Sequence, residues 1–455
     1  MNLNNIRLFF QKYFIVFFAL LLLLPQGVGV RFAPPFNFQL DLPRIFLFLT
    51  LFGSCAYIFK SSKKPISLGF FECALYFFGT WWILSSMQSA NTTNSFLFAV
   101  RFVCLFCLYP IAFMTLLRHS NFSQGYIFRI LTMILACLIF FGLWEFITQE
   151  YLISITYKFS FHNIERFADY GKKITRANGL LLQGPYLFNH ELGGMLAVFS
   201  GVLLKNLEKN KFFGFILSIG YFIVVIGVAS RASFIAILIS FIIWMLFRRN
   251  LINILLLGLS LVVAVCITDA RNIGNDVIYI DDITSLPTEI LNRNKLDVHY
   301  LETKLCGQNS SKFSYFQYHD VCSEILNNYG TLSIRLNGLL LNLANVSNWW
   351  LFGYSPGAFL LSMQVHSSAI QYSDPGLIFI FLMEGGIPAA AIIILLAFVS
   401  IKKGFKKNSS WMMSLGILSW FIFSLSSCAV WPFVPALIMM ALLERWNKLR
   451  KYDFD

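Results

Sequence analysis

The sequence predicts an all-α integral membrane protein with about twelve transmembrane helices and one large outer loop. Of its 455 residues, 57% are hydrophobic and only 13% are charged, whereas a soluble protein carries roughly 25% charged residues. Apolar runs of about 20 residues, the length that crosses a bilayer as a helix, recur along the chain. Lysines and arginines cluster between these runs, as membrane topology requires. The net charge of +13 therefore gives no reason to expect nucleic-acid binding.

The predicted spans fall into three groups. Residues 1–147 hold the first five, residues 187–267 the next four, and residues 376–455 the last three with a cytoplasmic tail. In order, the predicted spans are 13–30, 45–59, 67–86, 95–117, 126–147, 187–204, 212–229, 231–247, 251–267, 376–400, 411–428 and 430–444. Two long connections separate the groups, residues 148–186 and 268–375.

The basic residues predict the orientation, because lysine and arginine prefer the cytoplasmic side of a membrane. With the N-terminus inside, the inner segments hold most of them: Arg7, Lys12, Lys60, Lys63, Lys64, Arg118, Arg129, Lys205, Lys209, Lys211, Arg248, Arg249, Lys402, Lys403, Lys406, Lys407, Arg445, Lys448, Arg450 and Lys451. The short outer connections hold only Arg31, Arg44 and Arg231. Both termini are therefore expected in the cytoplasm, with both long connections outside.

The large outer loop, residues 268–375, is expected to contain short helices. Thr331 to Trp350 has an apolar leucine stripe and ends in two tryptophans, which suits an amphipathic helix at the membrane interface. Cys306 and Cys322 lie in the same loop. On an oxidising outer face they are expected to form a disulfide, and two free thiols are the alternative.

Ionisable residues inside spans are costly and therefore point to function. This sequence has seven: Glu72, Arg101, Glu145, His190, Glu191, Arg231 and Glu384. The predicted topology places all except Glu72 in the outer half of the bilayer. Arginine near the outer leaflet suits a phosphate-bearing lipid headgroup, since guanidinium binds phosphate through two parallel hydrogen bonds. We therefore expect a site beneath the large outer loop.

Structural interpretations of these residues remain open. Arg231 could anchor a helix at the interface, Glu384 could be a packed, protonated carboxyl, and Glu145 could simply pair with Arg101. The chain has no Walker A loop, no GxGxxG and no HExxH pattern, so no nucleotide, metal or other cofactor is expected. An enzyme of this kind would take an activated substrate from the membrane.

Four stretches, in order, resemble one family. They are "GPYLFNHELGGML" (184–196), "GVASRASFIAILISFIIWMLF" (227–247), "IRLNGLLLNLANVSNWWLFGYSPGAF" (from Ile334) and "HSSAIQYSDPGLIFIFLMEGG" (from His366). They are similar to motifs of the O-antigen polymerase and ligase superfamily of polytopic membrane glycosyltransferases. The similarity covers roughly residues 180–445 and includes the placing of the large loop between the motifs.

The resemblance implies a glycosyltransferase of the bacterial inner membrane whose donor is a polyprenyl-diphosphate-linked glycan. Polymerases (Wzy) pass the growing chain onto a new lipid-linked repeat unit, and ligases pass it onto lipid A core; both act on the periplasmic face without metal or nucleotide. The implied partners are the lipid-linked oligosaccharide and membrane lipid, with a chain-length regulator protein as a candidate. A lipid-linked oligosaccharide flippase is the alternative of another class, although flippases more often show two similar halves.

The resemblance also implies roles for single residues. Arg231 and Arg335 would hold the diphosphate, and His366 would orient or deprotonate the attacking hydroxyl. The other candidates for the base are Glu145, Glu191 and Asp374, and the other candidates for contacts to the diphosphate or glycan are Arg101, His190 and Trp349. These roles suit the chemistry, because fixed arginines can neutralise a departing diphosphate and a carboxylate or imidazole can accept a proton.

Overall fold

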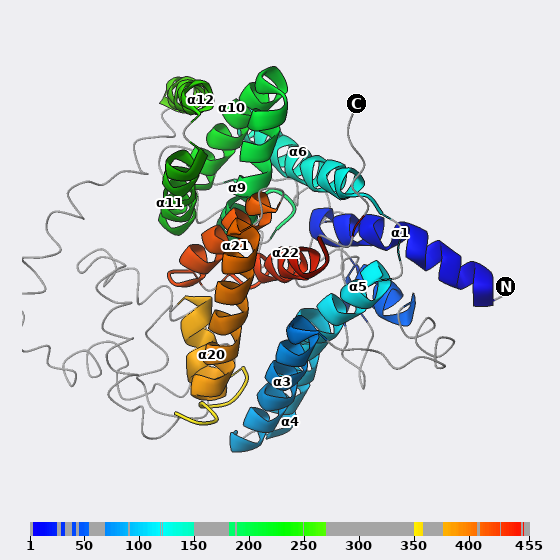
Figure 1. Cartoon of the computed structure of the whole chain (residues 1–455). Coiled ribbons are helices and arrows are strands. Elements are labelled where there is room, and N and C mark those ends of the chain that lie inside the picture. The colour runs from blue at the N-terminus through cyan, green and yellow to red at the C-terminus, as the bar shows by residue number, and fades with distance from the viewer. Residues whose placement is uncertain are drawn as a thin grey trace, which may run out of the picture.

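The computed structural model describes most of the predicted spans. The residues described are 3–24, 29–31, 39–41, 45–53, 69–89, 92–118, 120, 122–149, 182–186, 189–248, 250–269, 350–357, 376–406, 410–427, 429–446 and 449. This part of the chain is helical (Figure 1) except for turns and one two-stranded antiparallel ribbon, β1 (Gly29–Arg31) with β2 (Gln39–Asp41). The all-α prediction therefore holds for the bundle.

Helical residues occur in each of the twelve predicted ranges. The helices are α1 (Leu3–Leu23), α3 (Phe70–Ser85), α4 (Thr92–Val103), α5 (Tyr109–Arg118), α6 (Gln124–Thr148), α9 (Asn189–Lys209), α10 (Lys211–Val228), α11 (Arg231–Arg248), α12 (Leu251–Asp269), α20 (Leu377–Phe405), α21 (Trp411–Ser424) and α22 (Phe433–Arg445). In the described part of the chain, six helices are long and apolar enough to cross a membrane. The protein is therefore a helical membrane protein, and the number twelve stays a prediction.

The first predicted span, 13–30, is wrong at its outer end. Helix α1 ends at Leu23, and Gly29 and Val30 belong to strand β1. The sequence between them contains Pro25, which lacks the N–H that an interior helical residue donates, and glycine, which has a poor helix propensity. The predicted span was too long because it was based on the hydrophobicity of the run, which does not register these helix breakers.

A π-helical turn, Cys104–Leu108, joins α4 to α5 and makes them one continuous rod. It ends two residues before Pro110, which cannot donate a hydrogen bond to the preceding turn. Cys107 is buried and packs against Gly79 of α3, where an added Cβ would lie 3.3 Å from the Cys107 Sγ. Cys107 therefore serves the packing of this rod against α3.

Helix α9 is the centre of the bundle, surrounded by α6, α10, α11 and α21 (Figure 1). Small residues allow the close contacts that hold membrane helices together. An added Cβ at Gly201 of α9 would collide with the carbonyl of Met412, and one at Gly416 of α21 would collide with the carbonyl of Val198. Because each of the two helices meets its neighbour with a glycine, α9 and α21 pack backbone to backbone.

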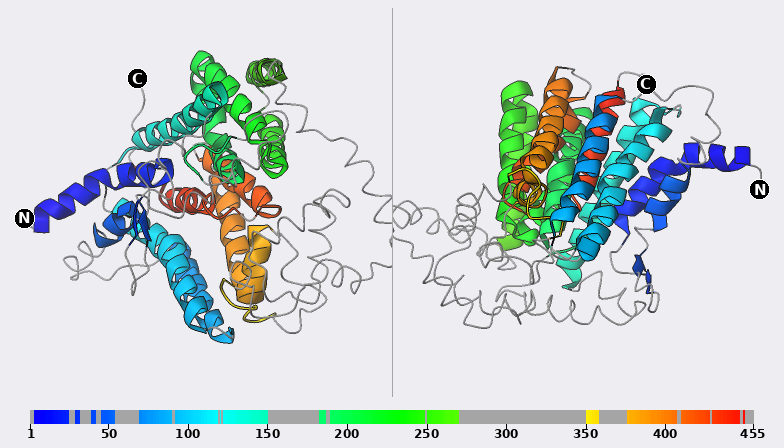
Figure 2. Two further views of the ribbon diagram at one scale, coloured as in Figure 1. Left: turned by 180° about the vertical axis from the view of Figure 1, so that it is seen from behind. Right: turned by 90° about the horizontal axis from the view of Figure 1, so that it is seen from below.

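The helices lie alongside one another (Figure 2, right), so the bundle has two ends. Hydrogen bonds join neighbouring segments at each of them. At one end, Gln124 Nε2 of α6 donates to the carbonyl oxygen of Trp446, 2.8 Å away. At the other, the Tyr186 hydroxyl donates to the carbonyl oxygen of Leu22, at 2.7 Å. We name these the inner and outer ends, following the side that the basic residues predict for each.

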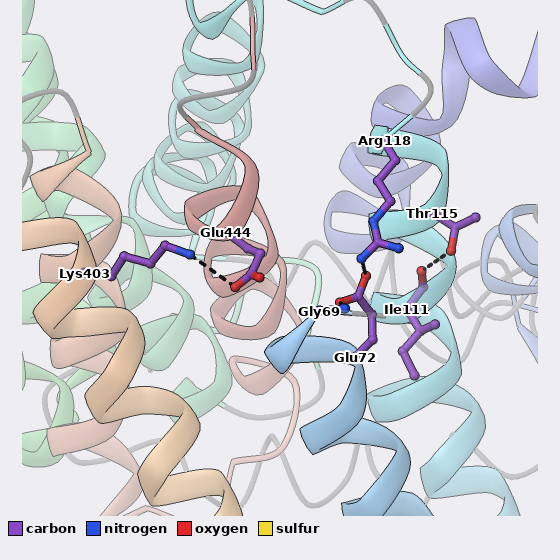
Figure 3. Close-up of polar contacts among 7 residues, drawn as sticks. All are labelled: Gly69, Glu72, Ile111, Thr115, Arg118, Lys403 and Glu444. Atoms are coloured by element: carbon purple, nitrogen blue, oxygen red, sulfur yellow. Dashed lines mark hydrogen bonds and ion pairs between the residues drawn. The ribbon is translucent and has the colours of Figure 1, made fainter. Parts of the chain in front are cut away.

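Ion pairs fasten the inner ends (Figure 3). Glu72, at the start of α3, is 1% exposed and pairs with Arg118 at the end of α5; it also accepts a hydrogen bond from the Gly69 N–H at 3.0 Å. Lys403 of α20 lies 3.3 Å from Glu444 of α22. At this end, ion pairs therefore link α3 to α5 and α20 to α22.

Candidate functional site at the outer helix ends

Four chain segments meet at the outer end and bring together several residues singled out in the sequence. We define the outer cluster as Glu145 at the end of α6, the turn 182–186, the first turn of α9 (residues 189–191) and Arg231, the first residue of α11. The 182–186 turn lies directly before α9 in the sequence, so its position governs where that helix begins.

Glu145 shapes the turn. Its side chain is completely buried, and one carboxylate oxygen, Oε2, accepts hydrogen bonds from the N–H groups of Gln183 (2.7 Å) and Gly184 (2.8 Å). Gly184 has a φ of +60°, which glycine adopts without strain. The N–H of Leu182 donates to the carbonyl oxygen of Gly227 in α10, at 3.1 Å. Oε2 of Glu145 therefore holds the backbone of the turn in place.

Further contacts tie the turn and the start of α9 to neighbouring helices. The Tyr186 hydroxyl donates to the carbonyl oxygen of Leu22 in α1 (2.7 Å), and Asn189 Nδ2 donates to the carbonyl oxygen of Val228 in α10 (2.8 Å). Burial raises the pKa of Tyr186 well above its ordinary value, and the negative charge of nearby Glu191 raises it further. The start of α9 is therefore held by α1 and α10 as well as by α6.

Helices α9 and α11 begin side by side. An added Cβ at Gly193, in the first turns of α9, would collide with the Ser233 hydroxyl of α11. Arg231 precedes Ser233 by two residues, and Glu191 precedes Gly193 by two. The two helices run in the same direction, so Arg231 lies at the same level of the bundle as His190 and Glu191. The structure thus places an exposed arginine, a half-buried histidine and a carboxylate that is 8% exposed at the same level of two adjacent helices.

This arrangement suits an anion. The first turn of a helix presents N–H groups that have no partner within the helix, together with the positive end of its dipole. Two such ends lie side by side here, and Arg231 adds a full positive charge. Glu191, in the first turn of α9, carries the opposite charge.

Arg101 lies apart from these groups. It is exposed on α4, and within the described part of the chain it forms no ion pair with Glu145. The alternative that these two residues neutralise each other is therefore wrong; the carboxylate of Glu145 is directed instead at the backbone of the 182–186 turn. Glu72 lies at the opposite end of the bundle from the outer cluster, where it pairs with Arg118.

Glu384 holds a different segment of the chain. Its side chain is 1% exposed and accepts a hydrogen bond from the Gly357 N–H, at 2.9 Å. Residues 350–357 belong to the predicted outer loop, yet they pack between helices. Trp350 was expected to end an amphipathic helix, but it lies in a turn and is 51% exposed. Its carbonyl accepts the N–H of Ile387, a bond outside any helix of its own.

Other sequence-predicted residues lie outside the described residues: Arg335, Trp349, His366, Asp374, Cys306 and Cys322. Their proposed roles, and the disulfide, stay predictions. Among the residues that the structure does describe, no group of three or more histidines, cysteines, aspartates and glutamates could hold a metal ion.

Sequence reasoning missed how the carboxylates are used. It identified Glu145 and Glu384 as buried charges but proposed neither backbone partner. The available signals were the Gly-Pro pair at 184–185 and the Gly-Gly-x-Pro pattern at 385–388, which mark irregular backbone near each carboxylate. No family model matches the chain, and no curated protein is significantly similar to it.

Proposed function

We propose that this protein is a polymerase of O-antigen or a related surface polysaccharide. It would act at the periplasmic face of the bacterial inner membrane and transfer a growing glycan from polyprenyl diphosphate onto a lipid-linked repeat unit. The proposal rests on one observation: Arg231 heads α11 at the outer end, level with His190 and Glu191 of the adjacent α9. The motif resemblance described above supports the same activity.

The reaction needs one bond formed and one broken. An acceptor hydroxyl oxygen bonds to the anomeric carbon of the donor glycan, while the bond from that carbon to the diphosphate oxygen breaks. The electron pair leaves with polyprenyl diphosphate, and the hydroxyl proton passes to a base. Charge builds on the departing diphosphate, so groups already fixed in place to neutralise it lower the barrier.

Arg231 and the two adjacent helix N-termini are the groups of the outer cluster that suit this anion. The outer cluster holds two carboxylates that are candidates for the base, Glu191 and Glu145; Oε2 of Glu145 also accepts two backbone N–H groups. His366, predicted from the resemblance, lies outside the described residues and remains a further candidate. The donor already carries a good leaving group, so the proposed reaction uses no nucleotide.

The direct test uses purified full-length protein in proteoliposomes with a polyprenyl-diphosphate-linked repeat unit. We expect a ladder of longer glycans without nucleotide. Arg231→Ala should lower the rate by about 10²–10³-fold, the usual effect of removing one charge-stabilising donor. Arg231→Lys should also be poor, because a point charge lacks the two-pronged geometry of guanidinium. Full activity of the lysine variant would remove the diphosphate role from Arg231.

Arg129→Ala is a matched control, because Arg129 is an exposed arginine at the opposite end of the bundle, on α6. It should leave polymer formation unchanged.

Gene deletion separates the polymerase activity from the ligase activity. Loss of a polymerase leaves single repeat units on the lipid core, and loss of a ligase removes O-antigen from the core altogether. Persistence of long chains after deletion would contradict both.

A further inference from the structure

Helix α20 is interrupted in its outer half. Gly386 has a φ of +74° and a ψ of −175°, which no α-helical residue adopts, and Pro388 follows it. A break of this kind leaves backbone carbonyl and N–H groups without partners in their own helix. In a membrane bundle such groups must find partners elsewhere in the protein, because lipid offers none.

Residues 350–357, here called the anchor segment, supply those partners. The N–H of Tyr354 donates to the carbonyl of Met383 (2.7 Å), and the N–H of Ser355 donates to the carbonyl of Glu384 (3.2 Å). In the other direction, the N–H of Ile387 donates to the carbonyl of Trp350 (2.8 Å). The anchor segment therefore completes the hydrogen bonding of the broken helix.

We call the contact between the anchor segment and residues 383–387 of α20 the joint. Side chains add further hydrogen bonds and a ring contact to it. The Glu384 carboxylate accepts the Gly357 N–H, at 2.9 Å. Trp81 of α3 donates its Nε1–H to the carbonyl of Gly385 (2.9 Å), and its ring stacks on Phe352 with centroids 4.8 Å apart. The anchor segment is thus held from α3 and α20 at once.

A further bond comes from α4, where the Ser95 hydroxyl donates to the carbonyl of Pro356 at 2.8 Å. Trp81 lies four residues before Ser85, the end of α3. At 1.5 Å per residue, this puts the joint about 6 Å inside that helix end. The anchor segment is therefore part of the bundle itself rather than of an outer surface.

Glycine is required on both sides of the joint. An added Cβ at Gly353 would collide with the backbone of Glu384, and one at Gly386 would collide with the carbonyl of Leu351. Both glycines have positive φ, +70° and +74°, which residues with side chains rarely adopt. The two backbones can therefore approach this closely because glycine stands at both positions.

We propose that Glu384 is a positioning residue that locks the anchor segment into the break of α20, so that residues 350–357 are a fixed point of the chain at the outer helix ends. The proposal rests on the proposed function only for what the loop does. Gly357 precedes His366 by nine residues, so the covalent chain keeps His366 within about 30 Å of the joint. Arg335 precedes Trp350 by fifteen residues on the other side of the joint. A fixed joint thus limits where both predicted catalytic-loop residues can go.

Hydrogen exchange of the full-length protein in nanodiscs tests the joint without any assay of activity. Peptides covering 350–357 should exchange slowly in the natural protein, because their N–H groups are bonded and buried. Glu384→Ala should speed this exchange by about tenfold or more, since the Gly357 N–H loses its acceptor. Glu384→Gln should stay near the natural rate, because its amide oxygen still accepts.

Two more variants keep the test decisive. Trp81→Phe preserves the stacked ring but removes the donor to Gly385, so exchange of the anchor segment should rise even if Glu384→Ala fails to fold. Glu444→Gln changes a glutamate at the inner end and should leave the segment unchanged. Fast exchange in the natural protein, or no rise in the folded Glu384→Ala and Trp81→Phe variants, overturns the proposal.

Polymer formation tests the positioning role separately. Glu384→Gln should keep the pH profile and most of the rate, whereas Glu384→Ala should lose about tenfold or more as the joint opens. If Glu384→Gln abolishes polymer while exchange stays slow, Glu384 acts in the chemistry and the positioning role fails. If exchange responds as expected but the natural protein forms no polymer, the joint stands and the proposed glycosyltransferase activity falls.

Discussion

The two ends of the bundle stabilise carboxylates in different ways. At the inner ends, Glu72, Glu208 and Glu444 each form an ion pair with lysine or arginine. At the outer ends, Glu145 and Glu384 accept hydrogen bonds from backbone N–H groups of loop residues. The inner carboxylates link helix to helix, and the outer ones link helices to the irregular segments between them.

The distribution of basic residues explains the difference. Lysine and arginine concentrate on the predicted cytoplasmic side, so an inner carboxylate has cations within reach. Glu208 illustrates this, because it lies 3.1 Å from Arg248 Nε and 3.4 Å from Lys205 Nζ and accepts a hydrogen bond from Trp244. The short outer connections offer few cations, and a buried carboxylate there needs N–H donors instead. The charge bias from which the orientation is predicted thus accompanies a difference in how the carboxylates at the two ends are stabilised.

The largest loss of stability from removing one inner carboxylate is expected at Glu72. Glu72→Ala removes the ion-pair partner that Arg118 has in α3, and the Arg118 side chain is only 12% exposed. Breaking a buried ion pair from one side costs about 3–5 kcal/mol, and we expect a stability loss of that size on titrating the protein with SDS in mixed micelles. Activity per folded molecule should be unchanged, because the pair lies at the inner end. Loss of activity without loss of stability would contradict a purely structural inner end.

Glu145→Ala should have an effect on stability of similar size and a larger effect on function. Two N–H groups, of Gln183 and Gly184, would lose their shared acceptor, at a cost of about 1–3 kcal/mol for each unsatisfied group. Because the turn they belong to leads into α9, polymer formation should fall further than stability predicts. Glu145→Gln retains an acceptor oxygen and should recover part of both. The same SDS titration and the polymer assay measure the two effects.

The positions of the helices could be predicted from the sequence because they depend on short-range properties. Length and hydrophobicity identify a span, and each predicted range contains helical residues. The error at the end of α1 came from Pro25 and the glycines after it, which hydrophobicity does not register. The grouping of His190, Glu191 and Arg231 could also be anticipated, since the topology places the first turns of two spans on the same side.

The partners of the outer carboxylates could not be predicted, because they are decided by contacts distant in sequence. Trp81 and Gly385, which meet at the break of α20, are 304 residues apart. The pattern Gly-Gly-x-Pro at 385–388 signals irregular backbone, but it does not say which segment will fill the break. A buried carboxylate in sequence looks the same whether a cation or a backbone N–H will stabilise it. Only the packed structure separates Glu384 from Glu72.

The smallest effect is expected at the exposed edge of the inner ends. Lys403 and Glu444 lie 3.3 Å apart, with side chains 37% and 26% exposed. Exposed pairs of this kind contribute only about 0.2–1 kcal/mol, so a double-mutant cycle of Lys403→Ala and Glu444→Ala should give a coupling energy in that range. The coupling should weaken in high salt, because solvent-exposed charges are screened. The contrary result would be a coupling energy as large as that of Glu72 with Arg118 and insensitive to salt. It would mean that the inner ends form one buried network. Burial, rather than the supply of cations, would then explain the difference between the two ends.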